Sequence, residues 1–228
     1  DVTNQKSGVS AVGLHRMLGF TSYVTAWTGL HKMRCAMVRP GRDRLRGAVE
    51  IDETYVGGVE KGVRGREPRK KSIVVIVLEI LSPKGFGRVR MRQVADVSGP
   101  SLVGVVRDVV EPGSIVHTDG WAGYNDLPKH GYERKRTVIS ASGDPAHVAM
   151  PGVHRIASLL KRWLLGTHQG SVSEKHLDDY LDEYTFRFNR RTSRSRGLLF
   201  YRLIQQAVEV DPMPYRRLVE EKRAIPNP

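Results

Sequence analysis

The stretch VEIDETYVGG at residues 49–58 decides the fold, together with the stretch IVHTDGW at residues 115–121. Each is a run of β-branched and other apolar residues that reaches an aspartate, Asp52 or Asp119, and then breaks at glycine. Such a run predicts a strand that carries a carboxylate with open space beside it. Two such carboxylates on neighbouring strands can hold divalent cations, and paired cations on carboxylates serve to cut and join phosphodiesters.

The composition indicates a polyanionic partner. The 228 residues include 37 Lys and Arg against 24 Asp and Glu, which gives a formal charge of +13 and a pI of about 10.1. This charge favours nucleic acid, although a merely soluble, positively charged enzyme has the same composition. No apolar run approaches the roughly 20 residues of a membrane span, and no signal peptide is visible. The single Cys35 excludes a disulfide scaffold and fits a reducing, cytoplasmic setting.

Residues 8–38 predict two helices separated by a turn. Ser10 is placed to cap the first helix, Gly19 to end it, and Ser22 to cap the second. A helix, a short turn with glycine and a basic helix form the outline of a helix-turn-helix, which would bind DNA. An αα-hairpin that packs on the main domain fits these residues equally well, so the sequence leaves the two alternatives open.

The middle of the chain predicts strands and the last part predicts helices. The strands are expected at residues 48–56, 72–81, 87–97, 114–118 and 132–139. The helices are expected at about 98–110, 153–165, 173–189 and 197–209, followed by an irregular tail. The first three strands have no crossover helix between them, so they should form an antiparallel meander, with later strands added after a helical crossover. The expected fold is α/β, a mixed five-stranded ribonuclease H-like sheet with helices on both faces.

These elements set the expected domain limits. They are residues 1–39 as a small helical, helix-turn-helix-like segment, 40–47 as a basic linker, 48–209 as the ribonuclease H-like catalytic domain and 210–228 as a C-terminal tail. One fold serves many functions, so the function has to be inferred from the site.

A third cation ligand is expected from a later helix. The candidates are Asp144, His154, Glu174, Asp178, Asp179, Asp182 and Glu183. Spacing favours the start of the helix at 153–165, where His154 and Lys161 are two helical turns apart and share a face. A neutral imidazole can ligate a metal but suits softer cations than Mg²⁺. From the residues alone, His154 is better explained as a capping or packing histidine.

Three basic segments are expected to contact DNA, because runs of Lys and Arg with few acids between them favour phosphate contact over a merely solvated surface. They are a glycine-rich loop with Lys61, Arg64, Arg66, Arg69, Lys70 and Lys71, the flanks of the site with Arg155 and Arg162, and a late cluster with Arg187, Arg190, Arg191, Arg194 and Arg196. Trp121 and Tyr124 either stack on an unpaired base beside Asp119 or belong to the core. The core is the expectation for Tyr124, and Trp121 is left open.

Several motifs in combination resemble the ISXO-type bacterial insertion-sequence transposases, which are DDE transposases with a ribonuclease H-like catalytic domain. The motifs are DETYVGG from Asp52, HTDGWAGY from His117, the segment Val153 to Leu164, GTH from Gly166 and FRFNRR from Phe186. The resemblance covers about residues 8–200. It implies that Asp52 and Asp119 are the catalytic aspartates. It also implies that His154 is the third ligand, at a position that is Glu in many relatives, with Lys161 as the basic partner seven residues later.

The resemblance further implies a metal-dependent DNA transposase with two divalent cations per site, Mg²⁺ or else Mn²⁺. Asp52 would be shared by both cations, Asp119 and His154 would each complete one coordination sphere, and Lys161 would hold a phosphate. Such an enzyme cuts at terminal inverted repeats, joins the 3′ ends to target DNA, assembles as a homo-oligomer on DNA and is cytoplasmic and nucleoid-associated. Two alternatives stay open: a ribonuclease H-like nuclease without strand transfer, and a catalytically decayed, basic DNA-binding protein.

Overall fold

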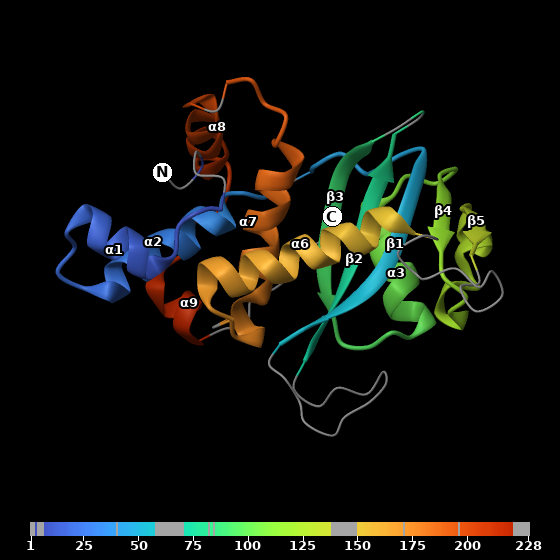
Figure 1. The fold of residues 1–228 in the computed structure, drawn as a ribbon, viewed down its shortest axis with the longest axis horizontal. Helices are drawn as coiled ribbons and strands as arrows, with labels where there is room; N and C mark the ends of the chain where they lie inside the picture. The colour runs from blue at the N-terminus through green and yellow to red at the C-terminus, as the bar shows by residue number, and fades with distance from the viewer. Residues whose placement is uncertain are drawn as a thin grey trace. The chain divides into compact units, whose positions relative to one another are not determined.

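The structure is a computed structural model that describes residues 3, 7–39, 41–57, 71–81, 83, 85–137, 150–170, 172–195 and 197–220. Figure 1 shows its helices and strands. The chain divides into two compact units. We call residues 43–162 the sheet unit, and residues 1–42 with 163–228 the helical unit.

A mixed five-stranded sheet forms the sheet unit (Figure 1). Its strands are β1 (Ala48–Val56), β2 (Ser72–Ile80), β3 (Phe86–Val94), β4 (Ile115–Thr118) and β5 (Glu133–Arg136). The order across the sheet is β3-β2-β1-β4-β5; the first three strands pair antiparallel, β4 runs parallel to β1, and β5 parallel to β4. These are the order and directions of a ribonuclease H-like sheet, so the predicted meander and fold class are confirmed.

The alternation of side chains along β1 fixes which residues face the core. Val49 and Ile51 are fully buried in the main apolar cluster of the sheet unit. Successive strand residues point to opposite faces, so Glu50 and Asp52 point to the other side of the sheet. A slip of one residue in the pairing of β1 would turn the apolar pair out of this cluster and turn both carboxylates into it, which strongly specifies the observed register.

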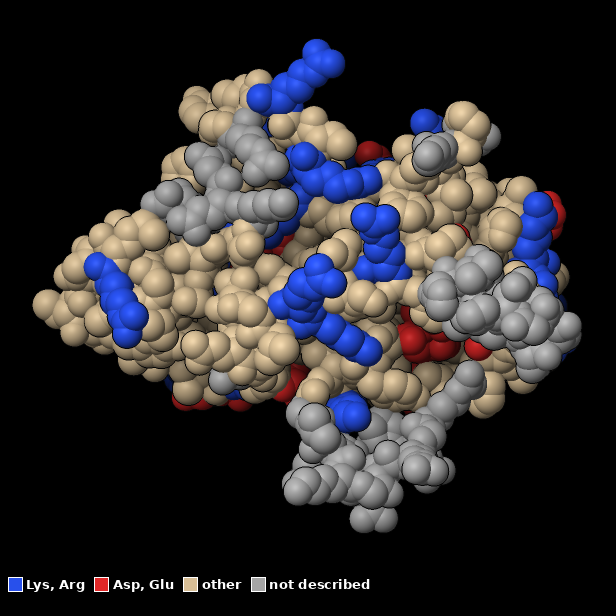
Figure 2. Space-filling view, viewed as in Figure 1, with Lys and Arg blue, Asp and Glu red and all other residues tan. Residues whose placement is uncertain are grey.

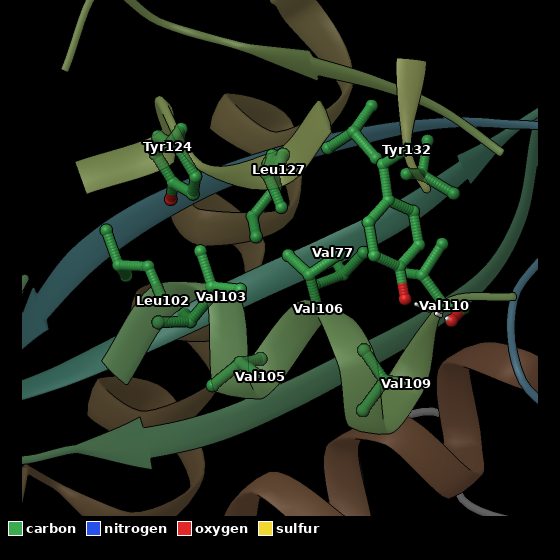
Figure 3. Packing of buried hydrophobic residues seen from close by; sticks show 14 of the residues in the cluster. Val77, Leu102, Val103, Val105, Val106, Val109, Val110, Tyr124, Leu127 and Tyr132 are labelled. Atoms are coloured by element: carbon green, nitrogen blue, oxygen red, sulfur yellow. Dashed lines mark hydrogen bonds between the residues drawn. The ribbon is translucent and has the colours of Figure 1, made fainter. Parts of the chain in front are cut away.

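Helix α3 (Gly99–Val109) covers one face of the sheet. It begins after Ser98, whose hydroxyl accepts the backbone N–H of Ser101 and so caps the helix. Leu102 and Val106 are fully buried against sheet residues such as Val77 (Figure 3). Burying each side chain of this size stabilises the fold by about 1.5–3 kcal/mol.

The first part of helix α6 (Pro151–His168) covers the other face of the sheet (Figure 1). Val153, Ile156 and Leu160 are almost completely buried and recur at helical spacing, so they form one apolar stripe. The sequence predicts this helix from residue 153, whereas it begins at Pro151, a residue that is well suited to the first helical position.

The helical unit is built from both ends of the chain. It contains α1 (Ala11–Leu18), α2 (Tyr23–Cys35), the short turn η3 (Glu174–His176), α7 (Leu177–Asn189), α8 (Gly197–Ala207), α9 (Tyr215–Glu220) and the end of α6. Ser10 and Ser22 cap α1 and α2 through their hydroxyls, and Gly19 ends α1 at a φ of 63°, all as predicted. Residues distant in sequence, such as Leu30 and Phe186, meet in one core cluster.

Helix α2 packs into the helical unit through polar side chains as well as apolar ones. Arg34 is 2% exposed, and its Nε donates to the Glu183 carboxylate of α7 at 2.8 Å. His31 is also fully buried, with its Nδ1 2.7 Å from the Asp179 carboxylate. Of the two alternatives for this segment, the packed αα-hairpin agrees better with a buried Arg34, because that side chain is not available to DNA.

The C-terminal stretch differs from the expected irregular tail. Residues 215–220 form α9, whose Leu218 is buried. The side chain of Lys175 donates to the carbonyl of Val219 and ties this helix to the helical unit. This helix could not be predicted from the sequence, because six residues are too few to show a helical repeat of apolar residues.

Strands β3 and β5 end earlier than predicted, at Val94 and Arg136. Residues 58–70, which contain most of the predicted glycine-rich basic loop, and residues 138–149 lie outside the described residues. No helix in the described part of the chain has both the length and the apolar character needed to cross a membrane.

Candidate active site

Asp52 and Asp119 belong to adjacent strands. Asp52 lies within β1, and Asp119 directly follows β4. The two strands pair in parallel, with Ala48 beside Ile115 and Glu50 beside His117. Continuing this register by two residues brings Asp119 level with Asp52. Because neighbouring strands lie about 4.8 Å apart, the two residues come close together on the adjacent interior strands β1 and β4.

The turn that carries Asp119 is held by Arg134 of β5. The guanidinium of Arg134 donates to the Thr118 hydroxyl at 2.9 Å and to the carbonyls of Asp119 at 3.1 Å and Trp121 at 3.0 Å. The Asp119 Oδ1 in turn accepts the Trp121 N–H at 2.8 Å. The rigid fork of an arginine can satisfy several acceptors at once, so the exit of β4 is fixed in one conformation.

His154 approaches Asp52 from the first turn of α6. Its Nε2 lies 3.8 Å from the Asp52 Oδ2; the two side chains are 30% and 21% exposed, but the Nε2 atom itself is buried. Among the described residues, the group of three potential metal ligands with all ligand atoms within 4.8 Å of one another is a different one, described below. Asp52, Asp119 and His154 are therefore spread more widely than ligands of a single compact ion.

Lys161 lies on the exposed surface of α6, two turns after His154. Burial of part of its side chain and the positive charge of Lys71 lower the pKa of Lys161, and the charge of Asp52 opposes this. Lys161 is therefore close enough to feel the charges of both Lys71 and Asp52. Figure 2 shows an exposed acidic area over β1 with Lys and Arg side chains nearby.

Glu53 and Tyr124 join the site, and the sequence analysis missed their contact. Tyr124 is buried, as expected, and its hydroxyl donates to the Glu53 Oε1 at 2.7 Å. Burial raises the pKa of Glu53 to about 7; the hydrogen bond from Tyr124 lowers it, and the charges of Asp52 and Asp119 raise it. The pKa of the Glu53 carboxyl group thus depends on the charges of both aspartates. No local signal reveals this contact, because the partners are 71 residues apart.

We expect Glu53→Gln to stabilise the protein at pH 8 and not at pH 4, in buffer free of divalent cations. A carboxyl group whose folded pKa is raised from 4.5 to about 7 stabilises the fold below pH 4.5, and this contribution is lost as the pH rises to 7. The shift corresponds to a gain for Gln on the order of 3 kcal/mol above pH 7. Urea unfolding at both pH values measures it, and equal stability of the two proteins at pH 8 would contradict the prediction.

The basic residues near the sheet are partly accessible. Arg155 and Arg162 are exposed on α6, and Lys71 is half-buried before β2. The remaining members of the predicted basic loop, and one of the late cluster, lie outside the described residues: Lys61, Arg64, Arg66, Arg69, Lys70 and Arg196.

The late arginine cluster divides into structural and exposed members. Arg187 is only 12% exposed and pairs with Glu183, four residues earlier on the same helix, at 2.9 Å. Arg190 and Arg191 stack on phenylalanine rings at 3.9 Å, and Arg194 is exposed. Arg187 is therefore a poor candidate for DNA contact, because its side chain is engaged inside the protein.

Trp121 packs with the core of the sheet unit. Its indole N–H donates to the Val97 carbonyl at 2.8 Å, and its ring packs against the main apolar cluster. Of the two alternatives for this residue, the structure favours a place in the core over stacking on a base.

A groove in the helical unit collects three arginines from different segments. Arg39, Arg190 and Arg202 line a cavity of about 820 Å³ together with serine and glutamine side chains. Burial and the positive charges of Arg39 and Arg202 lower the pKa of Arg190. Like charges that converge in this way favour an anion between them. Arg202 stands alone in the sequence, so no basic run marks it.

His31, His176 and Asp179 form a second polar cluster, in the helical unit. One ligand atom of each lies within 4.8 Å of the others, the spacing of a possible metal site. The Arg34 Nη1, which can only donate, lies 3.3 Å from the His31 Nε2. This places the imidazole proton on Nδ1, where it is donated to Asp179 at 2.7 Å. The cluster is thus explained as a hydrogen-bonded network that joins α2 to α7.

Comparisons with known proteins agree with the motifs. Residues 44–189 match the ISXO2-like transposase domain. A Halobacterium salinarum protein, described as an uncharacterized protein in transposable element ISH50, is 27% identical over 194 residues. That match covers 77% of this chain and 63% of the relative, so the chain spans less than two thirds of its length. An uncharacterized transposase-like protein of Haemophilus influenzae is 26% identical over 112 residues, which cover 49% of this chain and 89% of the relative.

Solved structures with distant similarity include a viral integrase and a transposase. The catalytic core domain of BIV integrase matches with a TM-score of 0.39 and 15% identity, covering 66% of this chain and 86% of that chain. The Mos1 transposase in a paired-end complex with the left transposon end matches with a TM-score of 0.41 and 13% identity, covering 79% and 62%.

Proposed function

Because this chain belongs to the ISXO2-like transposase family, we propose that it is the DNA transposase of an insertion element. It would cleave DNA at terminal inverted repeats and join the 3′ ends to target DNA by two-metal phosphoryl transfer. One observation carries the proposal: Asp52 and Asp119 stand level on adjacent parallel strands, with the His154 imidazole 3.8 Å from the Asp52 carboxylate. Two carboxyl groups and one imidazole would thus meet beside strands β1 and β4, where a phosphodiester would be bound.

The donor set fits divalent cations. Carboxylate oxygens are the ligands that Mg²⁺ and Mn²⁺ prefer, and an imidazole favours Mn²⁺ of the two. Asp52 and Asp119 also create a negative potential strong enough to contribute to the raised pKa of buried Glu53. Asp52 would hold both cations, with Asp119 on one side and His154 on the other, and this sharing agrees with the wide spread of the three side chains.

The residues of the site would have separate roles in binding and positioning the DNA. Bound cations would supply Lewis acidity for an attacking water or 3′-hydroxyl and for the leaving oxygen. Lys161 lies within the electrostatic reach of Asp52 and would bind a phosphate of the transposon end. Arg134 keeps the Asp119 turn rigid, and the pair of Glu53 and Tyr124 supports the strand from the opposite face. Preorganised charge and positioning account for most of the rate in such phosphoryl transfers.

DNA would be held by the exposed basic residues on α6 and by the arginine groove of the helical unit. Arg155 and Arg162 flank Lys161, and Arg39, Arg190 and Arg202 line the groove. Phosphate contacts by such residues depend steeply on salt. The two ends of an element must be processed together, so we propose that the protein assembles as a homo-oligomer on DNA.

The experiment that tests this function uses a labelled duplex that ends in the inverted repeat flanking the gene, a supercoiled target plasmid and Mg²⁺ or Mn²⁺. We expect label to be joined covalently to the plasmid. Hydrolysis without joining would instead support a ribonuclease H-like nuclease. Binding without any cleavage in either cation would support a decayed DNA-binding protein, an outcome that the histidine at position 154 makes worth testing.

We expect His154→Glu to retain or raise cleavage in Mg²⁺ and to reduce the preference for Mn²⁺ over Mg²⁺. A carboxylate at this position replaces a nitrogen ligand by oxygen, which magnesium prefers. Initial rates in each cation, with His154→Ala as the control that removes the ligand, measure the effect. Complete loss of activity in His154→Glu would show that the imidazole does something other than bind metal.

A further inference from the structure

Glu50 joins β1 to the beginning of α6. Its carboxylate is 8% exposed, and the Oε2 accepts the backbone N–H of Val153 at 2.9 Å. The N–H groups of a helix's first turn have no partner within the helix, and their partial positive charge favours an anion. A carboxylate from the sheet therefore fixes the first turn of α6 against the central strand.

The strand and the helix approach each other closely at Gly152, the second residue of α6. A Cβ added to Gly152 would lie 2.6 Å from the Glu50 Oε2 and 2.8 Å from the Leu78 Cδ2. Real Cβ atoms essentially never come this close to other heavy atoms, so any larger residue at position 152 would have to displace the ends of the Glu50 and Leu78 side chains.

The residues that are fixed in this way precede His154 directly. Glu50 and Asp52 are two apart on one strand and point to the same face. Val153 and His154 are neighbours in the first turn of α6. The hydrogen bond between Glu50 and Val153 therefore closes a short path that runs from the Asp52 carboxylate through β1 and α6 to the His154 imidazole.

We propose that Glu50 is a positioning residue that sets the separation of His154 from Asp52 by holding the first turn of α6. This inference rests on the proposed function, in which both of those residues bind the catalytic cations. Glu50 itself is not placed as a ligand, because it is nearly buried and one carboxylate oxygen is occupied by the helix N–H. Groups that orient metal ligands typically change metal affinity 10–100-fold when they are removed.

The test measures Mn²⁺ affinity of the 228-residue chain by isothermal titration calorimetry, without DNA, for Glu50→Ala, Glu50→Gln and wild type. We expect Glu50→Ala to weaken binding by about 10–100-fold. Glu50→Gln keeps an oxygen acceptor for the Val153 N–H and loses only the charge at the helix terminus, so it should stay within about fivefold of wild type. Gly152→Ala should weaken binding in the same way as Glu50→Ala, because its Cβ would displace the Glu50 carboxylate from the Val153 N–H.

Glu79 offers a matched control. It is a buried carboxylate in β2 that accepts the backbone N–H groups of Arg46 and Arg88. Glu79→Ala should cost stability and leave Mn²⁺ affinity within about twofold of wild type, since it holds no metal ligand.

The outcomes separate this inference from the proposed function. Wild-type affinity in folded Glu50→Ala, an equal loss in Glu50→Gln and Glu50→Ala, or an equal loss in Glu79→Ala would each overturn the positioning role. Unchanged Mn²⁺ affinity in Asp52→Ala would instead overturn the metal site itself. If Glu50→Ala does not fold, the contrast between Glu50→Gln and Gly152→Ala decides: similar losses in both would overturn the proposal.

Discussion

Asp52→Asn should reduce DNA cleavage by roughly a thousandfold or more, since loss of a shared carboxylate removes several kcal/mol of transition-state stabilisation. Asn has nearly the same shape as Asp, so β1 and its buried neighbours Val49 and Ile51 should be unaffected. Asp119→Asn should have a similar effect, because the β1–β4 register places it level with Asp52. Rates with a labelled terminal repeat measure both losses.

DNA binding provides the internal reference for this prediction. Affinity measured in the absence of divalent cations should stay near the wild-type value in both variants. Asp126→Asn is a matched control, because Asp126 is 56% exposed and pairs only with the nearby Lys129 among the contacts described. Near-normal cleavage by Asp52→Asn or Asp119→Asn would defeat the assignment of the site.

Arg34→Met should destabilise the helical unit by about 3 kcal/mol, at the lower end of the range for breaking a buried ion pair. The Arg34–Glu183 pair has side chains that are 2% and 1% exposed, and the guanidinium also lies 4.1 Å from the centre of the Tyr180 ring. Its removal leaves the Glu183 carboxylate with Arg187 alone, at 2.9 Å. Urea unfolding followed by tryptophan fluorescence measures the loss, because Trp27 and Trp163 both belong to this unit.

Two further variants define the origin of this effect. Arg216→Met breaks an ion pair whose side chains are 83% and 55% exposed, so it should cost less than about 1 kcal/mol. Adding Glu183→Gln to Arg34→Met should recover part of the loss, because it removes the uncompensated charge. A loss below about 1 kcal/mol in Arg34→Met would show that the buried pair contributes little to folding.

Local signals in the sequence were sufficient for the elements of the fold. β1 occupies residues 48–56 as predicted, because alternating apolar residues and a terminal glycine mark a strand without reference to the rest of the chain. Ser10 and Ser22 cap helices as predicted, because capping depends only on the next few residues. The fold class followed from the order of these elements.

Contacts between distant residues could not be predicted in the same way. Arg34 was expected on a basic helix face, but its partner Glu183 is 149 residues away. Arg187 was expected to contact DNA, yet it pairs with the same carboxylate. A run of arginines has one appearance in the sequence whether its members point to solvent or into a core, so burial alone separates the two cases.

The candidate site shows the same limit. Asp52 and Asp119 could be named because each ends an apolar run before glycine, and the neighbouring position of their strands followed from the order of the elements. Glu50 was missed because a charged residue inside a strand gives no sign of what it contacts. Only its hydrogen bond to Val153 reveals its role.

The two edges of the sheet have a consequence for self-association. β3 and β5 are the outermost strands; β5 carries the exposed cations Lys135 and Arg136, whereas Arg90 of β3 is buried and its Arg88 and Arg92 pair with acids. Positive charge on an outermost strand opposes the addition of a second copy through backbone pairing, a common route to aggregation. The β5 edge is therefore protected from pairing with the same edge of a second copy, and a bound polyanion would neutralise that repulsion only where it is bound.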